Sequence, residues 1–254
     1  MRILLTNDDG VGSGLLAALA RQLDTVGDVD VIAPAADMTG VSRSLSLHGP
    51  IAVDEIALPD GRPAFAVVGT PVDCVRFGAL GLAGGKPDVV ISGPNYGVNL
   101  GDDVAYSGTV AAALEAALLD LPAAAFSQQA GPEGEFDASE LGRFAATLVP
   151  VLASGALPLG VVLNVNGPGG PVAGVRVTRL GRRHYRPQLR PAVESEGGRR
   201  HYRLYGSEPL RLEGEPGTDI AAVADGYIAL TPLRFDLFAD DALPALTALL
   251  PEAG

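Results

Sequence analysis

Two adjacent aspartates, Asp8 and Asp9, come directly after a short apolar run at residues 2–6. This run has the β-rich composition of a parallel strand that is buried on both faces. Open α/β sheets place their ligands at the carboxyl ends of such strands, where the two acids stand. Neighbouring carboxylates repel each other, and a divalent cation is a natural counter-charge because hard cations bind carboxylate oxygens. The alternative is that the two acids only form a turn, since Asp is common in turns.

Two further polar loops are expected at the same edge of the sheet. The second loop, residues 37–44, offers hydroxyl oxygens. The third loop, residues 92–103, offers amide oxygens, two more acids and glycines that let the backbone approach a ligand closely. It continues into a hydroxyl-rich turn at residues 106–111, at the start of an expected helix whose free N–H groups favour an anion. Acids on one loop and an anion-binding helix start on another are what metal-assisted hydrolysis of a phosphate ester requires.

Each of these residues also has a simple structural explanation. Ser107 and Thr109 could merely cap the helix that follows them. Asn95 and Asn99 could be ordinary loop residues, and Thr39 a turn hydroxyl. What these explanations leave unexplained is the placement of all these side chains at one edge of the expected sheet.

Alternating strand-like and helix-like segments must position these loops. The pattern predicts an α/β fold with a Rossmann-like, doubly wound and mostly parallel sheet. Strands are expected at residues 2–6, 29–33, 51–56, 64–68, 88–92, 123–126, 161–165, 175–178 and 227–230. Helices are expected at residues 13–25, from residue 70, and at residues 108–119, 138–153 and 241–250.

Composition excludes several classes of protein. With 47% hydrophobic residues, the 254-residue chain can bury a sizeable core. A net charge of −12 disfavours nonspecific binding of nucleic acid. The single cysteine, Cys74, fits a reducing compartment, and no segment resembles a signal peptide or a membrane span. The expectation is a cytoplasmic protein with no membrane or nucleic-acid partner.

Positive charge is concentrated in one part of the chain. Residues 176–211 hold ten arginines and three glutamates, so this segment carries +7 and the remainder −19. We expect a catalytic core at residues 1–180 and an extended basic hairpin arm at residues 181–215. Residues 216–254 then complete the core or form an oligomer interface. The arm is either a solvated hairpin or an element that contacts an anionic ligand or a second subunit.

The loops just described resemble those of the SurE family, the metal-dependent survival-protein nucleotidases. The most specific stretch is Asn99 to Glu115, which reads NLGDDVAYSGTVAAALE. Matching stretches span nearly the whole chain, at residues 1–11, 33–34, 39–42, 69–74, 92–99, 101–115, 217–219 and 226–233. The resemblance implies hydrolysis of nucleoside 5′- and 3′-monophosphates with one divalent cation such as Mg²⁺ or Mn²⁺. It also implies a homodimer or homotetramer.

The resemblance further implies roles for individual residues. The metal ligands carried over are Asp8, Asp9, Thr39 and Asn95. The phosphate-binding residues carried over are Asn99, Ser107, Gly108 and Thr109, and the catalytic group is Asp8, Asp9, Asn99 and Ser107. Two positions depart from the family pattern. Thr39 replaces a serine, which adds a methyl group, and residues 11–14 lack a proline and are one residue short.

Three other functions remain open at this point. A haloacid-dehalogenase-like phosphatase needs a general acid two residues after its nucleophilic aspartate, but position 10 is Gly10. A nucleotide-binding module without catalysis does not need the intact acids and Asn95. A phosphatase that acts mainly on non-nucleotide phosphate esters would use the same residues.

Overall fold

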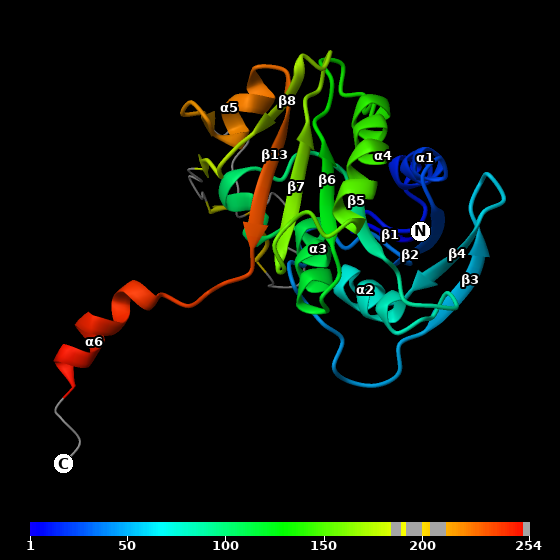
Figure 1. The fold of residues 1–254 in the computed structure, drawn as a ribbon, viewed down its shortest axis with the longest axis horizontal. Coiled ribbons are helices and arrows are strands. Elements are labelled where there is room, and N and C mark those ends of the chain that lie inside the picture. The colour runs from blue at the N-terminus through cyan, green and yellow to red at the C-terminus, as the bar shows by residue number, and fades with distance from the viewer. Residues whose placement is uncertain (184–188, 192–199, 204–211, 251–254) are drawn as a thin grey trace.

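The computed structural model describes residues 1–183, 189–191, 200–203 and 212–250. A nine-stranded sheet forms the centre of the fold, with helices on both faces (Figure 1). In spatial order its strands are β3 (Val53–Ala57), β4 (Pro63–Val67), β2 (Asp28–Pro34), β1 (Arg2–Thr6), β5 (Val89–Tyr96), β6 (Ala123–Gln128), β7 (Val161–Gly167), β13 (Tyr227–Arg234) and β8 (Gly174–Val177). Most neighbours are parallel, whereas β3 runs antiparallel to β4 and β13 runs antiparallel to β7. The predicted Rossmann-like, mostly parallel α/β fold is confirmed.

Two helical layers enclose the sheet. The helices α1 (Gly14–Leu23) and α4 (Ser139–Ala153) pack on one face, where Leu16, Leu19 and Phe126 belong to a buried apolar cluster. The helices α2 (Pro71–Ala79) and α3 (Gly108–Leu118) cover the other face. Because side chains alternate between the two faces along each strand, the layers divide the buried residues of a strand between two clusters.

The starts of α1, α2 and α3 follow the sequence signals, whereas α4 begins after Ala138 without a side-chain cap. Ser13, Thr70 and Ser107 are the N-cap residues of α1, α2 and α3, and each side chain accepts a hydrogen bond from a backbone N–H in the first turn. At α2 the cap is reciprocal, because the Asp73 carboxylate also accepts from the Thr70 N–H at 2.8 Å. These caps fix where the preceding loops end.

The later strands are added to the sheet on both sides of β1. From β1 the chain moves outward through β2 and β4 on one side, and β5, β6 and β7 follow on the other side. The point at which the direction reverses lies between β1 and β5. The loops after these two strands therefore border the crevice in which doubly wound sheets bind ligands.

Two strands run further than the sequence indicated. The third polar loop was expected to begin at residue 92, but β5 continues to Tyr96, since it resumes pairing with β6 after an irregularity between Ser92 and Asn95. Likewise β7 continues to Gly167, beyond the expected end at residue 165. Asn95 and Asn166 are thus strand residues with fixed neighbours.

The described residues after β8 include two short antiparallel strand pairs. Short antiparallel pairs join β9 (Arg182–Arg183) to β12 (Leu212–Glu213), and β10 (Arg190–Pro191) to β11 (Tyr202–Arg203). The rest of the expected basic arm lies outside the described residues. α5 (Asp219–Ala224) packs against β13, and a 3₁₀ turn, η1 (Gly101–Ala105), follows β5.

The last described segment extends away from the sheet. After β13, residues 235–250 form a C-terminal tail that includes the turn η2 (Asp240–Ala242) and the short helix α6 (Leu243–Leu249). Figure 1 shows α6 standing apart from the two helical layers. Within the described part of the chain, no helix is long and apolar enough to cross a membrane.

Candidate active site

The first loop, residues 7–10 directly after β1, is a tight turn held by its own side chains. The Asn7 amide Nδ2 donates to the carbonyl oxygen of Gly10 at 2.9 Å. Gly10 has φ +95°, and a Cβ at this position would lie 3.1 Å from the carbonyl carbon of Ala36. A glycine is therefore required on two grounds, its left-handed backbone and the close approach of the chain after β2. The turn brings Asp8 and Asp9, which we call the acid pair, to the end of β1.

Asp8 is buried against the start of α3. The backbone N–H of Thr109 donates to Asp8 Oδ2 at 3.1 Å, and the Thr109 hydroxyl donates to Asp8 Oδ1. Burial raises the pKa of Asp8, while the hydrogen bonds from Thr109 favour the ionised form. The predicted metal acid and the predicted phosphate-binding threonine are therefore in direct contact, 101 residues apart in sequence.

Asp9 lies beside Asp8 and is less buried. Its Oδ2 accepts a hydrogen bond from the backbone N–H of Tyr96 at 3.3 Å, which links the first loop to the end of β5. Burial, reinforced by the neighbouring Asp8 carboxylate, raises the pKa of Asp9 to about 7. Two carboxylates that disfavour each other's ionisation form the electrostatic setting that a bound cation relieves.

The two other predicted metal ligands differ in their surroundings. The Nδ2 of Asn95 donates to the carbonyl oxygen of Gly97 at 2.8 Å, so its Oδ1 is the atom left for a cation. Thr39 is exposed, and its backbone N–H and hydroxyl both donate to the carboxylate of Asp37, at 2.8 and 2.6 Å. The Thr39 hydroxyl oxygen keeps lone pairs that can bind a cation, while the hydroxyl hydrogen points to Asp37.

The second loop is fastened to the rest of the site on both sides. The N–H of Met38 donates to the backbone oxygen of Asp8 at 2.7 Å. Further along, Arg43 pairs at 3.0 Å with Glu115, a carboxylate of α3 that is 3% exposed. The Arg43 guanidinium also lies over the ring of Phe235, 3.8 Å from its centroid. The loop that carries Thr39 is thus attached to the turn after β1, to α3 and to the start of the C-terminal tail.

The N-terminus of α3 forms the predicted phosphate side, which we call the phosphate cradle: Ser107, Gly108 and Thr109. Ser107 is the N-cap and accepts from the Val110 N–H at 3.1 Å. A Cβ at Gly108 would lie 2.8 Å from both Cβ and Oδ2 of Asp8. The first turn of α3 therefore approaches the acid pair more closely than any residue with a side chain would allow.

Asn99 lies across the ends of β6 and β7. Its side-chain Nδ2 donates to the Ser127 hydroxyl at 2.8 Å, and its backbone N–H donates to Asn166 Oδ1 at 2.8 Å. The backbone oxygen of Asn99 accepts from Asn164 at 2.8 Å and from Asn166 at 3.2 Å. Asn99 is thus part of a buried polar network, in which the contacts of Ser127, Asn164 and Asn166 were not predicted from the sequence.

The donor set fits a hard divalent cation. It consists of two carboxylates, an amide oxygen and a hydroxyl, all oxygen ligands of the kind that Mg²⁺ and Mn²⁺ bind. Across the described ranges, no group of three or more His, Cys, Asp or Glu side chains is placed to hold a metal. A cation here therefore depends on the neutral oxygens of Asn95 and Thr39 in addition to the acid pair.

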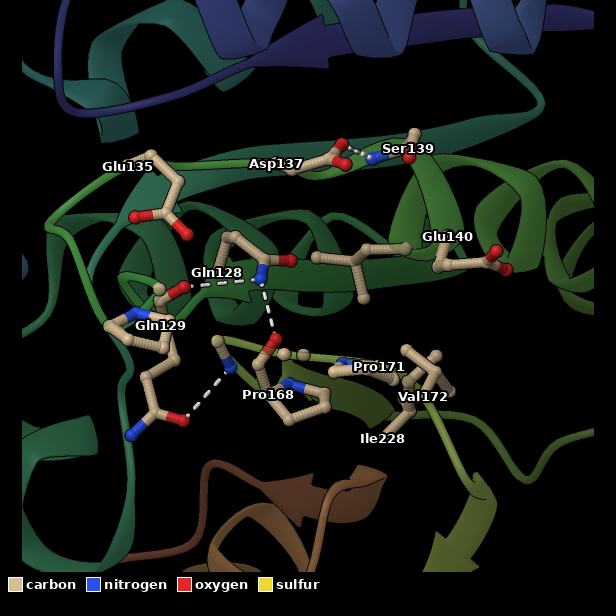
Figure 2. Close-up of a pocket in the computed structure, with 16 residues that line it drawn as sticks. Gln128, Gln129, Glu135, Asp137, Ser139, Glu140, Pro168, Pro171, Val172 and Ile228 are labelled. Carbon is tan, nitrogen blue, oxygen red and sulfur yellow. Dashed lines mark hydrogen bonds between the residues drawn. The ribbon is translucent and has the colours of Figure 1, made fainter.

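A separate cavity of about 430 Å³ is lined by residues of β6, β7 and α4 and of the loops beside them (Figure 2). Ser127 and Gln128 are consecutive on β6, so their side chains point to opposite faces. Ser127 contacts Asn99, while Gln128 lines the cavity and donates to the carbonyl oxygen of Pro168 at 2.8 Å. Glu135, Asp137 and Glu140 give the cavity an acidic wall, and none of the predicted site residues lines it. Such a wall disfavours a phosphate group.

Comparison with known proteins fits this geometry. The family model for survival protein SurE matches residues 3–187, which include every predicted metal and phosphate residue. The chain belongs to the SurE family. A protein from Rubrobacter xylanophilus named 5′-nucleotidase SurE is 45% identical over 248 residues, which cover 93% of this chain and 92% of the relative.

Other SurE proteins match over almost their whole length. A protein from Cronobacter sakazakii named 5′/3′-nucleotidase SurE is 41% identical, with coverage of 100% of this chain and 98% of the relative. The crystal structure of the SurE protein from Aquifex aeolicus superimposes with a TM-score of 0.78 at 33% identity, covering 98% of this chain and 99% of that one. The resemblance that the motifs indicated is confirmed.

Proposed function

We propose that the acid pair and the phosphate cradle are the two halves of the site with which this SurE nucleotidase removes phosphate from nucleoside 5′- and 3′-monophosphates. The observation that carries the proposal is the contact between Asp8 and Thr109, because it joins the cation side to the anion side. Water attacks the phosphorus atom, the ester P–O bond breaks, and nucleoside and inorganic phosphate leave.

Asp8, Asp9, Asn95 and Thr39 would hold one divalent cation, Mg²⁺ or Mn²⁺. Such an ion supplies charge neutralisation at the phosphoryl oxygens. The protein's own contribution is to fix the oxygens that hold it. Asp8 is oriented by two hydrogen bonds from Thr109 and Asp9 by one from Tyr96, so neither carboxylate must reorganise when substrate arrives.

The phosphate cradle and Asn99 would hold the phosphate group itself. The N–H groups of Thr109 and Val110 are bonded to Asp8 and to the Ser107 hydroxyl, so the Ser107 hydroxyl hydrogen, the Gly108 backbone and the helix dipole are what α3 offers to the phosphate. Gly108 keeps the surface of this turn free of a side chain next to Asp8. Asn99 and Ser107 then orient the oxygens of the phosphate for in-line attack.

Phosphate release from a panel of substrates tests the proposal directly. The panel contains nucleoside 5′- and 3′-monophosphates, p-nitrophenyl phosphate and phosphorylated sugars, each assayed with Mg²⁺, Mn²⁺ or EDTA. We expect metal-dependent release that is fastest with nucleotides. Faster release from non-nucleotide esters would indicate a different physiological substrate. Nucleotide binding without any release would indicate a binding module instead.

A pair of substitutions at Thr39 tests its role as a ligand. Thr39→Ser keeps the oxygen and removes a methyl group, so we expect an unchanged metal titration. Thr39→Val keeps the shape and removes the oxygen, so the apparent metal affinity should fall by about tenfold, as for loss of one neutral ligand. Activity titrated against Mn²⁺ measures both. Identical titrations for Thr39→Val and the unmodified protein would remove Thr39 from the ligand set.

The C-terminal tail supports the proposal that the enzyme is a homodimer or homotetramer. Leu237 is 82% exposed and Leu249 79% exposed, and Phe238, Leu246 and Leu250 are also exposed. A row of large apolar side chains on a projecting segment is typical of a surface that packs against another subunit. We propose that the tail and the basic arm both contact a second copy of the chain.

Removal of residues 235–254 should therefore lower the oligomeric state. Light scattering at working concentration measures this, with circular dichroism as the check that the core remains folded. Replacement of residues 183–203 by a short turn should have the same effect. An unmodified protein that is strictly monomeric would contradict the proposal.

The cytoplasmic location expected from the single cysteine remains a prediction, to be tested by cell fractionation.

A further inference from the structure

Asn99 is held from three sides by side chains of β6 and β7. Asn166 exchanges two hydrogen bonds with the Asn99 main chain, one with its N–H and one with its carbonyl oxygen. The side-chain amide of Asn166 thus makes the two hydrogen bonds that the backbone of a neighbouring strand would otherwise make. Asn164 gives the same carbonyl oxygen a second donor, and Ser127 accepts from the Asn99 side chain. Both main-chain polar groups of Asn99 are therefore satisfied by side chains.

The supporting residues are rigid themselves. Ser127, Asn164 and Asn166 are all fully buried, and they lie inside strands whose register fixes their positions. Ser127 pairs with Asn166 across β6 and β7, so the two side chains emerge next to each other on the face covered by α3. Because strands hold side chains more precisely than loops, Asn99 takes its position from the sheet rather than from its own loop.

Burial of this network has an energetic cost that the fold alone does not require. Asn164 and Asn166 stand in a strand that also contains the buried apolar residues Val162, Leu163 and Val165. The Oδ1 atom of Asn164 has no hydrogen-bond partner among the described residues. A valine at position 164 would fill the layer without the unpaired Oδ1 atom, whereas a valine at position 166 would leave the buried N–H of Asn99 unpaired. Both asparagines are therefore explained by the main chain of Asn99 that they hold.

We infer that Asn166, together with Ser127 and Asn164, positions Asn99 for phosphate binding. The inference rests on the proposed function, in which Asn99 contacts the phosphate. It assigns the three residues no contact with substrate and no part in metal binding. Asn166 acts on the main chain of Asn99, and Ser127 orients its side chain.

A double-mutant cycle between Asn99 and Asn166 tests this inference. Asn166→Ala should lower kcat by about 10- to 100-fold, as for loss of a group that orients a ligand-binding residue. It should raise the inhibition constant of inorganic phosphate and leave the Mn²⁺ titration unchanged. In the Asn99→Ala background the same substitution should cost less than about threefold, since no side chain remains to be positioned.

Thr231→Val serves as the matched control. Thr231 lies opposite Asn164 on β13 and shares a buried hydrogen bond of 2.7 Å with Thr178, while the hydrogen bonds of Asn99 among the described residues go to Ser127, Asn164 and Asn166. Loss of the hydrogen bond to Thr178 should lower the thermal midpoint but leave kcat and phosphate binding unchanged. If Asn166→Ala does not fold, Ser127→Ala removes the hydroxyl at almost constant volume and should lower kcat by about 3- to 10-fold.

Two outcomes would overturn the inference. One is that Asn166→Ala lowers kcat by the same factor in the Asn99→Ala background as in the unmodified protein, since Asn166 would then support the fold in general. The other is an unchanged phosphate inhibition constant in both Asn166→Ala and Ser127→Ala. Failure of the proposed function gives a different result, because an unmodified protein that releases no phosphate can still be titrated with inorganic phosphate by calorimetry.

Discussion

Asp8→Asn is expected to abolish at least about 99% of the phosphatase activity while the protein remains folded. The substitution removes one charge from the acid pair and places an NH₂ group where the carboxylate now accepts from Thr109. It therefore weakens the cation site and the orientation of the α3 start together. Loss of a preorganised charged group in an active site costs on the order of 100-fold or more in rate.

The measurement is kcat with AMP or p-nitrophenyl phosphate, beside a thermal unfolding curve. Removal of the metal by EDTA should have the same effect on activity, and added Mn²⁺ should restore the unmodified protein but not the variant. Asp225→Asn is the matched control, because it removes the same charge at the end of α5, where Asp225 pairs with Arg176. Near-normal activity of Asp8→Asn, or of the unmodified protein in EDTA, would exclude the metal mechanism.

Gly108→Ala should inactivate the enzyme almost as severely. Alanine is favoured over glycine in a helix by about 1 kcal/mol. If position 108 served only the stability of α3, Gly108→Ala would therefore stabilise the protein. Here the new methyl group would meet Cβ and Oδ2 of Asp8, both at 2.8 Å. Either the start of α3 or the Asp8 carboxylate must move. A misplacement of about 1 Å in an active site costs about 100-fold in rate.

Gly142→Ala is the control for the helix effect. Gly142 lies in α4, and a Cβ there would meet the Gln22 side chain, whose nearest atom is at 3.0 Å and can rotate aside. This variant should keep full activity and a similar or higher thermal midpoint. An active Gly108→Ala enzyme would show that the acid pair and the phosphate cradle need not be in contact.

The sequence predicted the residues at the edge of the sheet because the rule that places them there is general. Parallel strands present their carboxyl ends to one edge, so polar residues after several strands must converge. Asp8 and Thr109 are an example, since a short strand and a helix start sufficed to predict that they lie at the same edge, although their direct contact was not predicted. The family resemblance then gave these residues roles that spacing alone had left open.

The support of Asn99 could not be predicted in the same way. Its contacts join residues 28, 65 and 67 positions apart, and their partners depend on which strands are neighbours. The alternation of asparagine with apolar residues in β7 was a visible signal, but it does not tell which group the amides hold. The contact of Thr39 with Asp37 was also not predicted, because it depends on the local geometry of an exposed loop.

Polar side chains cross the centre of the sheet in one row. Thr6, Ser92, Asn164 and Thr231 are buried, and the strand pairing places them in register on β1, β5, β7 and β13, with Ala125 between them on β6. A shift of one residue in any of these pairings would turn a polar side chain toward the apolar cluster under α1 and α4. In the native pairing Thr6 Oγ1, Ser92 Oγ and Asn164 Oδ1 already have no hydrogen-bond partner among the described residues. The shift therefore costs the bonds that are made, from Asn164 to Asn99 and between Thr231 and Thr178, at about 1–3 kcal/mol for each buried group left unpaired. Asn164 and Thr231 therefore also discriminate against misaligned β7 and β13 during folding, and the correct pairing of these strands is selected by hydrogen bonding as well as by apolar packing.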